Sequence, residues 1–90
     1  MPKLTFLDDP PRDENVTGYD QQHVGLYLRL LDAEADRANW RDVAKVIFGI
    51  DPSGDYARAR RVYDNHLARA RLLAASGHKD LLSRKGKSRM

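Results

Sequence analysis

Four side chains that can hold phosphate groups recur every three or four residues in the C-terminal half of the chain. They are Arg58, Arg61, Asn65 and Arg69. Residues at this spacing share one face of a helix, and a guanidinium fork can donate hydrogen bonds to phosphate oxygens and to base edges. The pattern is therefore compatible with direct DNA binding. The alternative interpretation is a solvated helix face, on which Arg60 pairs with Asp64 four residues later.

The distribution of charge argues against a uniformly cationic surface. The 90 residues carry 16 basic and 13 acidic side chains, a net charge of +3. Residues 83–90 hold four of the bases and no acid, whereas residues 20–55 hold four bases and seven acids. Because affinity for DNA rests mainly on cationic contacts, the acidic half of the folded region would oppose DNA binding. We therefore treat direct DNA binding as the alternative hypothesis.

Residues that could catalyse a reaction or hold a metal show no functional spacing. The chain has no cysteine, and its three histidines, His23, His66 and His78, lie far apart without the spacing of metal ligands. No catalytic Ser-His-Asp set and no glycine-rich phosphate loop stands out. We expect no enzyme activity, no metal, no cofactor and no small-molecule substrate. His66 falls within an apolar helix face and is expected to belong to the core.

The sequence also lacks the features of a membrane or exported protein. No apolar run approaches the roughly 20 residues that span a bilayer, and no basic-then-apolar leader opens the chain. Without cysteine, nothing indicates an oxidising compartment. We expect a cytoplasmic protein that makes no contact with a membrane.

The first predicted helix, residues 21–35, has an unusually wide apolar face. Asp20 is placed to cap its start, and Leu26 and Leu30 widen the face beyond the arc that a surface helix needs. This width indicates either a central helix or a face that binds a partner protein. We assign a partner-binding role to Leu26, Tyr27 and Leu30, and also to Trp40, since aromatic side chains dominate binding hot spots.

Two further helices are predicted over residues 40–48 and 56–75, with no strand-like alternation anywhere in the chain. The turn that joins them, residues 49–55, is longer than the turn of about three or four residues in a standard helix-turn-helix. The sequence therefore predicts an all-α fold, a three-helix domain with a variant, extended-turn helix-turn-helix.

The predicted turn carries several signals of an ordered backbone. Gly49 is placed to end the preceding helix in the left-handed conformation. Pro52 presets its own backbone angle, and Gly54 can adopt a positive φ. Ile50 is expected to plug the junction between the two helices.

Three segments are expected along the chain: a flexible acidic arm over residues 1–18, the helix-turn-helix-like domain over residues 19–82, and a disordered basic tail over residues 83–90. The arm contains a short apolar island at Leu4, Phe6 and Leu7. We expect this island to fold back on the core; a docking motif is the sharper alternative.

Several stretches of the chain resemble a known family. They are Tyr19-Asp20-Gln21-Gln22-His23, Leu28-Arg29-Leu30-Leu31-Asp32-Ala33, Trp40-Arg41-Asp42-Val43-Ala44 with Phe48-Gly49-Ile50-Asp51-Pro52, and Arg58-Ala59-Arg60-Arg61 followed by Gly77-His78-Lys79-Asp80-Leu81-Leu82. Over residues 19–82 this pattern resembles the proteobacterial domain of unknown function two-two-eight-five. The resemblance implies an extended-turn helix-turn-helix fold that is common on mobile elements.

What the resemblance implies about function depends on the type of member. Some members are the DNA-contacting half of transcriptional activators of conjugative transfer, whereas others stand alone as antiactivators. Only an acidic arm precedes the domain here, so the chain resembles the stand-alone antiactivators of the QseM type. The leading hypothesis is an antiactivator that binds and inactivates a transcriptional activator of conjugative transfer and, as a second partner, a quorum-sensing regulator. The alternative is a DNA-binding transcriptional regulator that uses the third helix.

Overall fold

The computed structural model describes residues 6–75, which form a helical domain. Its elements are α1 (Gly18–Gln22), α2 (Val24–Ala35), α3 (Trp40–Val43), the π-helical turn η1 (Ala44–Phe48) and α4 (Tyr56–Ala75), with no strand in the described range. The expected all-α fold with an extended-turn helix-turn-helix is confirmed. The tail expected over residues 83–90, together with His78, lies outside the described residues.

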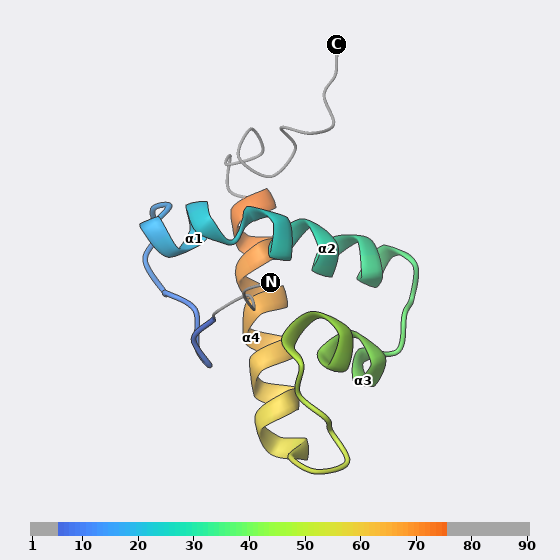
Figure 1. Cartoon of the computed structure of the whole chain (residues 1–90). Helices are drawn as coiled ribbons and strands as arrows, with labels where there is room; N and C mark the ends of the chain where they lie inside the picture. Colours follow the sequence, from blue (N-terminus) through green and yellow to red (C-terminus); the bar gives the residue numbers. More distant parts are fainter. Residues whose placement is uncertain (1–5, 76–90) are drawn as a thin grey trace.

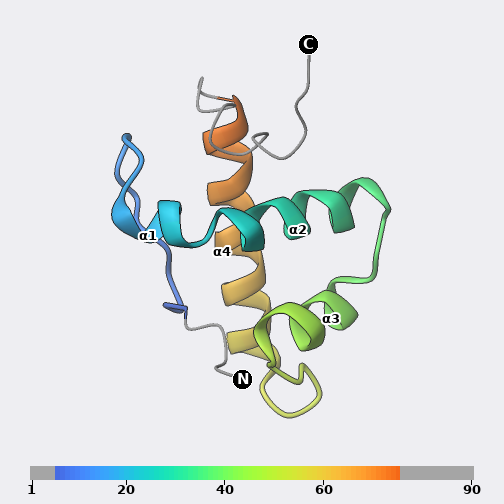
Figure 2. The same ribbon diagram turned by 45° about the horizontal axis from the view of Figure 1, so that its top comes forward.

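Helix α4 is the axis on which the other elements pack. Figures 1 and 2 show α2 crossing α4, with α3 and η1 beside the N-terminal half of α4. Residues 6–17 lie on the side of α4 away from α3 in both views. The largest fully buried side chains are Asp20, Tyr27, Leu30, Val62, His66 and Leu73. Asp20 and His66 carry ionisable groups, and Tyr27 carries a polar hydroxyl. The core therefore depends on polar pairing as well as on apolar burial.

The first helix is interrupted, and the prediction of one continuous helix over residues 21–35 with an Asp20 cap is wrong. Thr17 caps α1 instead, because its hydroxyl accepts the Asp20 backbone N–H while the Asp20 carboxylate accepts the Thr17 backbone N–H. Asp20 is therefore the third residue of α1. The chain leaves helical geometry at His23, where φ is −116°, and α2 begins at the next residue.

The turn between η1 and α4 is ordered, as the sequence predicts. Gly49 ends η1 in the left-handed conformation with φ 69°, Ile50 is buried, and the Asp51 carboxylate accepts the Ser53 backbone N–H at 2.9 Å. Hydrogen bonds from Ser53 lower the pKa of Asp51. Gly54 does not adopt the expected positive φ. Its N–H donates to the Asp51 carbonyl and closes a turn, and the last position of such a turn does not require glycine.

A buried ion pair joins α1 to α4. The Arg69 guanidinium donates to the Asp20 carboxylate, with Nη2–Oδ2 at 2.6 Å and Nε–Oδ1 at 3.1 Å, and the Tyr27 hydroxyl donates to the same carboxylate at 2.7 Å. Burial by itself would raise the pKa of Asp20, but hydrogen bonds from Arg69, Tyr27 and Thr17 outweigh it and lower the pKa to about 2. Asp20 is therefore ionised and fully paired at neutral pH.

Replacement of Arg69 by alanine should strongly destabilise the domain. The Asp20 carboxylate would remain buried without its cation, and breaking a buried pair in this way costs about 3–5 kcal/mol of unfolding free energy. Arg71→Ala is the matched control on the same helix, since Arg71 pairs with Glu34 at the surface and exposed pairs contribute only about 0–1 kcal/mol. Urea denaturation measures both. Equal losses in the two variants would contradict the structural role of Arg69.

Acid should remove the stabilising contribution of Asp20. Because the folded-state pKa of Asp20 is about 2, below its ordinary value of 3.8, the unfolded chain binds the proton more readily and stability falls with pH. The contribution, roughly 2 kcal/mol, is fully present above about pH 4 and is lost as the pH approaches 2. Urea midpoints between pH 6 and pH 2 should therefore fall more steeply for the wild type than for Asp20→Asn. Parallel curves would contradict the assignment.

Candidate nucleic-acid interface

The apolar face of α2 that the sequence assigned to a partner is buried inside the domain. Leu26, Tyr27 and Leu30 expose 4%, 0% and 0% of their surface. Helix α4 packs against α2 and covers this face, and the Tyr27 hydroxyl is held by Asp20. The prediction that these three side chains form a free partner-binding face is wrong. The alternative, a central helix, accounts for the wide apolar arc.

Trp40, the fourth residue assigned to a partner, is only partly buried and lies where α3 meets the start of α4. Its ring contacts the Tyr56 ring, with centroids 5.4 Å apart. The guanidinium carbons of Arg41 and Arg60 lie 5.2 and 4.7 Å from its centroid, within the range of attractive cation–π contacts. We call Trp40, Arg41, Tyr56 and Arg60 the aromatic–cationic cluster. Tyr56 is exposed, so the cluster reaches the surface at the N-terminal end of α4.

Arg69 is a structural residue, and its assignment to DNA is wrong. Its side chain is buried against Asp20, and its remaining N–H groups donate to the backbone carbonyls of Asp13 and Asn15. A signal for this was present in the sequence. Arg69 stands seven residues after Val62 and four before Leu73, both of which face the core, so it lies at the edge of the apolar arc.

Arg58 and Arg61 remain at the surface and hold one carboxylate between them. Arg58 donates through Nε and Nη2 to both oxygens of Asp8 at 3.0–3.2 Å, and Arg61 Nη2 donates to Asp8 Oδ2 at 3.2 Å. The hydrogen bonds from Arg58 lower the pKa of Asp8, and Asp8 in turn raises the pKa of Arg58. The two arginines thus form a receptor for an oxyanion, the geometry that also suits phosphate.

Asn65 extends this contact by one turn of α4. Its side-chain amide donates to Asp9 Oδ1 at 2.7 Å, and Arg61 Nε lies 3.5 Å from the same oxygen. The sequence therefore places Arg58, Arg61 and Asn65 correctly on one flank of α4. It did not reveal that the flank is already occupied by the segment that precedes α1.

Residues 6–15 belong to the arm expected over residues 1–18 and are called the acidic arm from here on; they are fixed at both ends. The Phe6 ring packs against the Phe48 ring at 5.1 Å, as expected for an island that folds back on the core. Leu7 of the same island is exposed, and Leu4 lies outside the described residues. The Leu7 N–H donates to the Tyr19 hydroxyl at 3.1 Å, which lies 2.7 Å from His66 Nε2. His66 Nδ1 donates to the Val62 carbonyl at 2.9 Å, which leaves Nε2 to accept the tyrosine proton. Burial lowers the pKa of His66, so this chain of bonds holds a neutral imidazole.

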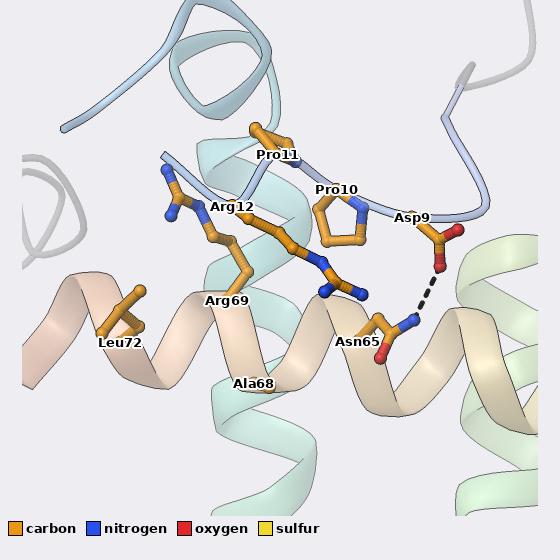
Figure 3. A pocket seen from close by; sticks show the side chains of 8 residues that line it. All are labelled: Asp9, Pro10, Pro11, Arg12, Asn65, Ala68, Arg69 and Leu72. Carbon is orange, nitrogen blue, oxygen red and sulfur yellow. Dashed lines mark hydrogen bonds between the residues drawn. The ribbon is translucent and has the colours of Figure 1, made fainter. Parts of the chain in front are cut away.

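The middle of the acidic arm covers a hollow of about 240 Å³ on α4. Figure 3 shows Pro10 and Pro11 carrying the arm over the helix, with the Asp9–Asn65 hydrogen bond at one end and Arg69 towards the other. Arg12 turns back over Ala68 in the same view. Residues of the arm and of α4 line the hollow together, so it marks the interface between these two segments.

Asp8 and Asp9 are the functional candidates that sequence reasoning missed. The acidic run before Pro10 and Pro11 was visible, but no local pattern states which cations it meets. The partners lie 50–56 residues further along the chain. Only the opposite charge of the two segments could have suggested the contact.

Within residues 6–75, no group of three or more potential metal ligands is present. None of the helices in that range is long and apolar enough to cross a membrane.

Comparison with known protein families identifies the family of the chain. No curated protein sequence matches the chain. The RovC DNA-binding domain family, described as a T6SS transcription factor DNA-binding domain, matches residues 3–83. This agrees with the predicted helix-turn-helix domain of a transcriptional regulator, although the match names neither the domain of unknown function two-two-eight-five nor the QseM type. Because the match covers nearly the whole chain, the protein belongs to the RovC DNA-binding domain family of transcription factors.

Proposed function

We propose that the chain regulates transcription by binding double-stranded DNA through the N-terminal half of α4. The observation that carries the proposal is the oxyanion receptor formed by Arg58 and Arg61, which binds a carboxylate with four N–H···O contacts of 3.0–3.2 Å. Phosphate oxygens can replace carboxylate oxygens in such a fork. The membership of a DNA-binding family supports the same conclusion.

The position of α4 suits this role. In a helix-turn-helix, the second helix enters the major groove and its N-terminal residues contact the bases, while the first helix crosses the backbone. Here α4 is the second helix, and Arg58 and Arg61 lie within its first two turns. The aromatic–cationic cluster places Arg41 of α3 beside the same end, where it can reach a second stretch of phosphates.

The charge of the domain limits this proposal to a local contact. Residues 6–75 carry ten basic and twelve acidic side chains, so the domain as a whole does not attract DNA. Attraction must come from the start of α4, where Arg58 and Arg61 lie close together. Arg60 of the same turn pairs with Asp64 at 3.0 Å, as the sequence predicts for a solvated helix face. We therefore expect moderate affinity that depends strongly on salt.

A second candidate, the antiactivator that captures another regulator, is favoured by a different surface from the one first assigned to it. Val46 exposes 72% of its surface and lines a hollow of about 410 Å³ between α2 and η1. Asp32, Asp36 and Asp42 also line it, and none of them forms an ion pair within residues 6–75. A partner with apolar side chains flanked by bases would fit this surface.

The DNA proposal predicts that Arg58→Ala and Arg61→Ala each weaken DNA binding. Each variant should lower affinity for a labelled 30-base-pair duplex by about five- to tenfold and reduce the slope of log K against log salt by about one, because one phosphate contact is lost. Fluorescence anisotropy between about 50 and 200 mM salt measures both. Arg29→Ala on α2 is the control of equal charge. If it weakens binding equally, the flank of α4 is not the DNA site.

The antiactivator candidate predicts that Val46→Asp weakens binding to a transcriptional activator of conjugative transfer. A charge in the apolar floor would be desolvated by the partner, which should weaken a two-protein complex at least about tenfold. Titration calorimetry with the purified activator measures the loss, and Leu72→Asp on exposed α4 is the control. Retained binding by Val46→Asp would exclude this surface.

A further inference from the structure

All four residues that the sequence selected for DNA contact are bonded to the acidic arm. Arg58 and Arg61 bind the Asp8 carboxylate, and Asn65 binds Asp9. Arg69 donates to the backbone carbonyls of Asp13 and Asn15. A DNA phosphate that approaches Arg58 and Arg61 would need the same N–H groups that Asp8 already occupies.

We propose that the acidic arm is an internal competitor of DNA, which occupies the Arg58–Arg61 receptor and must be displaced before α4 can bind a duplex. The inference rests on the proposed DNA-binding function and adds the regulation of that site. A carboxylate and a phosphate make the same fork contact with a guanidinium. The arm therefore imitates the ligand at the position where the ligand would bind.

The ion pairs that Asp8 and Asp9 form with α4 are exposed enough to break without unfolding the domain. The Asp8 and Asp9 side chains are 33% and 52% exposed in these pairs, and exposed ion pairs stabilise little. Tethering nevertheless gives the carboxylates a high effective concentration beside α4. The arm can thus stay closed in the free protein and still yield to a duplex that offers many phosphates.

The two ends of the arm would keep it attached while its middle opens. Phe6, before the two carboxylates, packs on Phe48, and Pro10, directly after them, is buried. At the other end, Arg69 binds Asp20 deep in the core as well as the carbonyls of Asp13 and Asn15. Opening therefore needs only the Asp8 and Asp9 side chains to leave their partners, and the fold does not depend on these two pairs.

Neutralising the arm should raise affinity for DNA. Asp8→Asn/Asp9→Asn should bind a labelled 30-base-pair duplex about five- to tenfold more tightly than the wild type at low salt, as expected if the receptor is open only a tenth to a fifth of the time. The gain should shrink as salt rises, because salt also opens the wild-type arm. Asp8→Asn alone should give an intermediate gain.

The control must remove the same charge elsewhere, since any loss of acid favours DNA. Asp32→Asn/Asp36→Asn on and after α2 also removes two acids, which form no ion pair within residues 6–75 and lie away from the arm. If both double variants gain affinity equally, the competitor proposal is overturned although DNA binding stands. If no variant binds the duplex at low salt, the proposed function fails and the competitor proposal fails with it.

Hydrogen exchange in the free protein tests whether the two carboxylates hold the arm closed, independently of any change in DNA affinity. Hydrogen exchange of the Arg58 Nε–H, which donates to Asp8, should quicken in Asp8→Asn/Asp9→Asn and stay unchanged in the control, whereas the Leu7 amide at the attached end of the arm should keep its rate in every variant. Circular dichroism should show equal helix content in all variants. Unchanged exchange of the Arg58 Nε–H together with unchanged affinity would show that the two carboxylates do not hold the arm closed.

Discussion

The fold of this domain depends on the charge pair between Asp20 and Arg69. The carboxylate is completely buried, which is tolerable only because Arg69, Tyr27 and Thr17 together satisfy its oxygens. The pair fixes α1 to α4. Through the carbonyls of Asp13 and Asn15, the same guanidinium also fixes the end of the acidic arm. One arginine therefore ties Asp13, Asn15 and Asp20 to α4.

Helix α4 contributes one face to the hydrophobic core and presents another face at the surface. Its buried side carries Val62, His66 and Leu73, which pack against α2 and η1. Its exposed flank carries Arg58, Arg61 and Asn65, spaced so that a single extended segment can meet all three. Because a helix repeats every 3.6 residues, residues four positions apart lie near one another on the helix surface without being equally buried. Arg69 is buried in the core, whereas Asn65, four residues earlier, is only partly buried.

The nearly balanced charge of the domain is compatible with both candidate functions, DNA binding and the capture of another protein. The described residues carry slightly more acid than base, so the attraction for DNA depends on where the charges lie and on which of them pair with one another. In the proposed mode of DNA binding, Arg58 and Arg61 contact phosphate only after Asp8 and Asp9 have left them. The surface beside Val46, which we propose for protein capture in the second candidate function, is lined by Asp32, Asp36 and Asp42, and these acids form no ion pair in the described part of the chain. The amino-acid composition alone therefore does not distinguish a DNA-binding regulator from an antiactivator. The two candidates differ in which charged side chains form ion pairs within the domain.

The sequence by itself determined the elements that depend on local chemistry. Helical periodicity, the stop at Gly49 and the turn chemistry around Asp51 are decided within a few residues, so the all-α class and the long turn before α4 were predictable. The tertiary structure decided what depends on distant partners: the burial of Leu26, Tyr27 and Leu30 under α4, the pairing of Arg69 with Asp20, and the seating of Asp8 and Asp9 on α4. These contacts join residues about 50 positions apart, and nothing in a local pattern specifies which faces of two helices will meet.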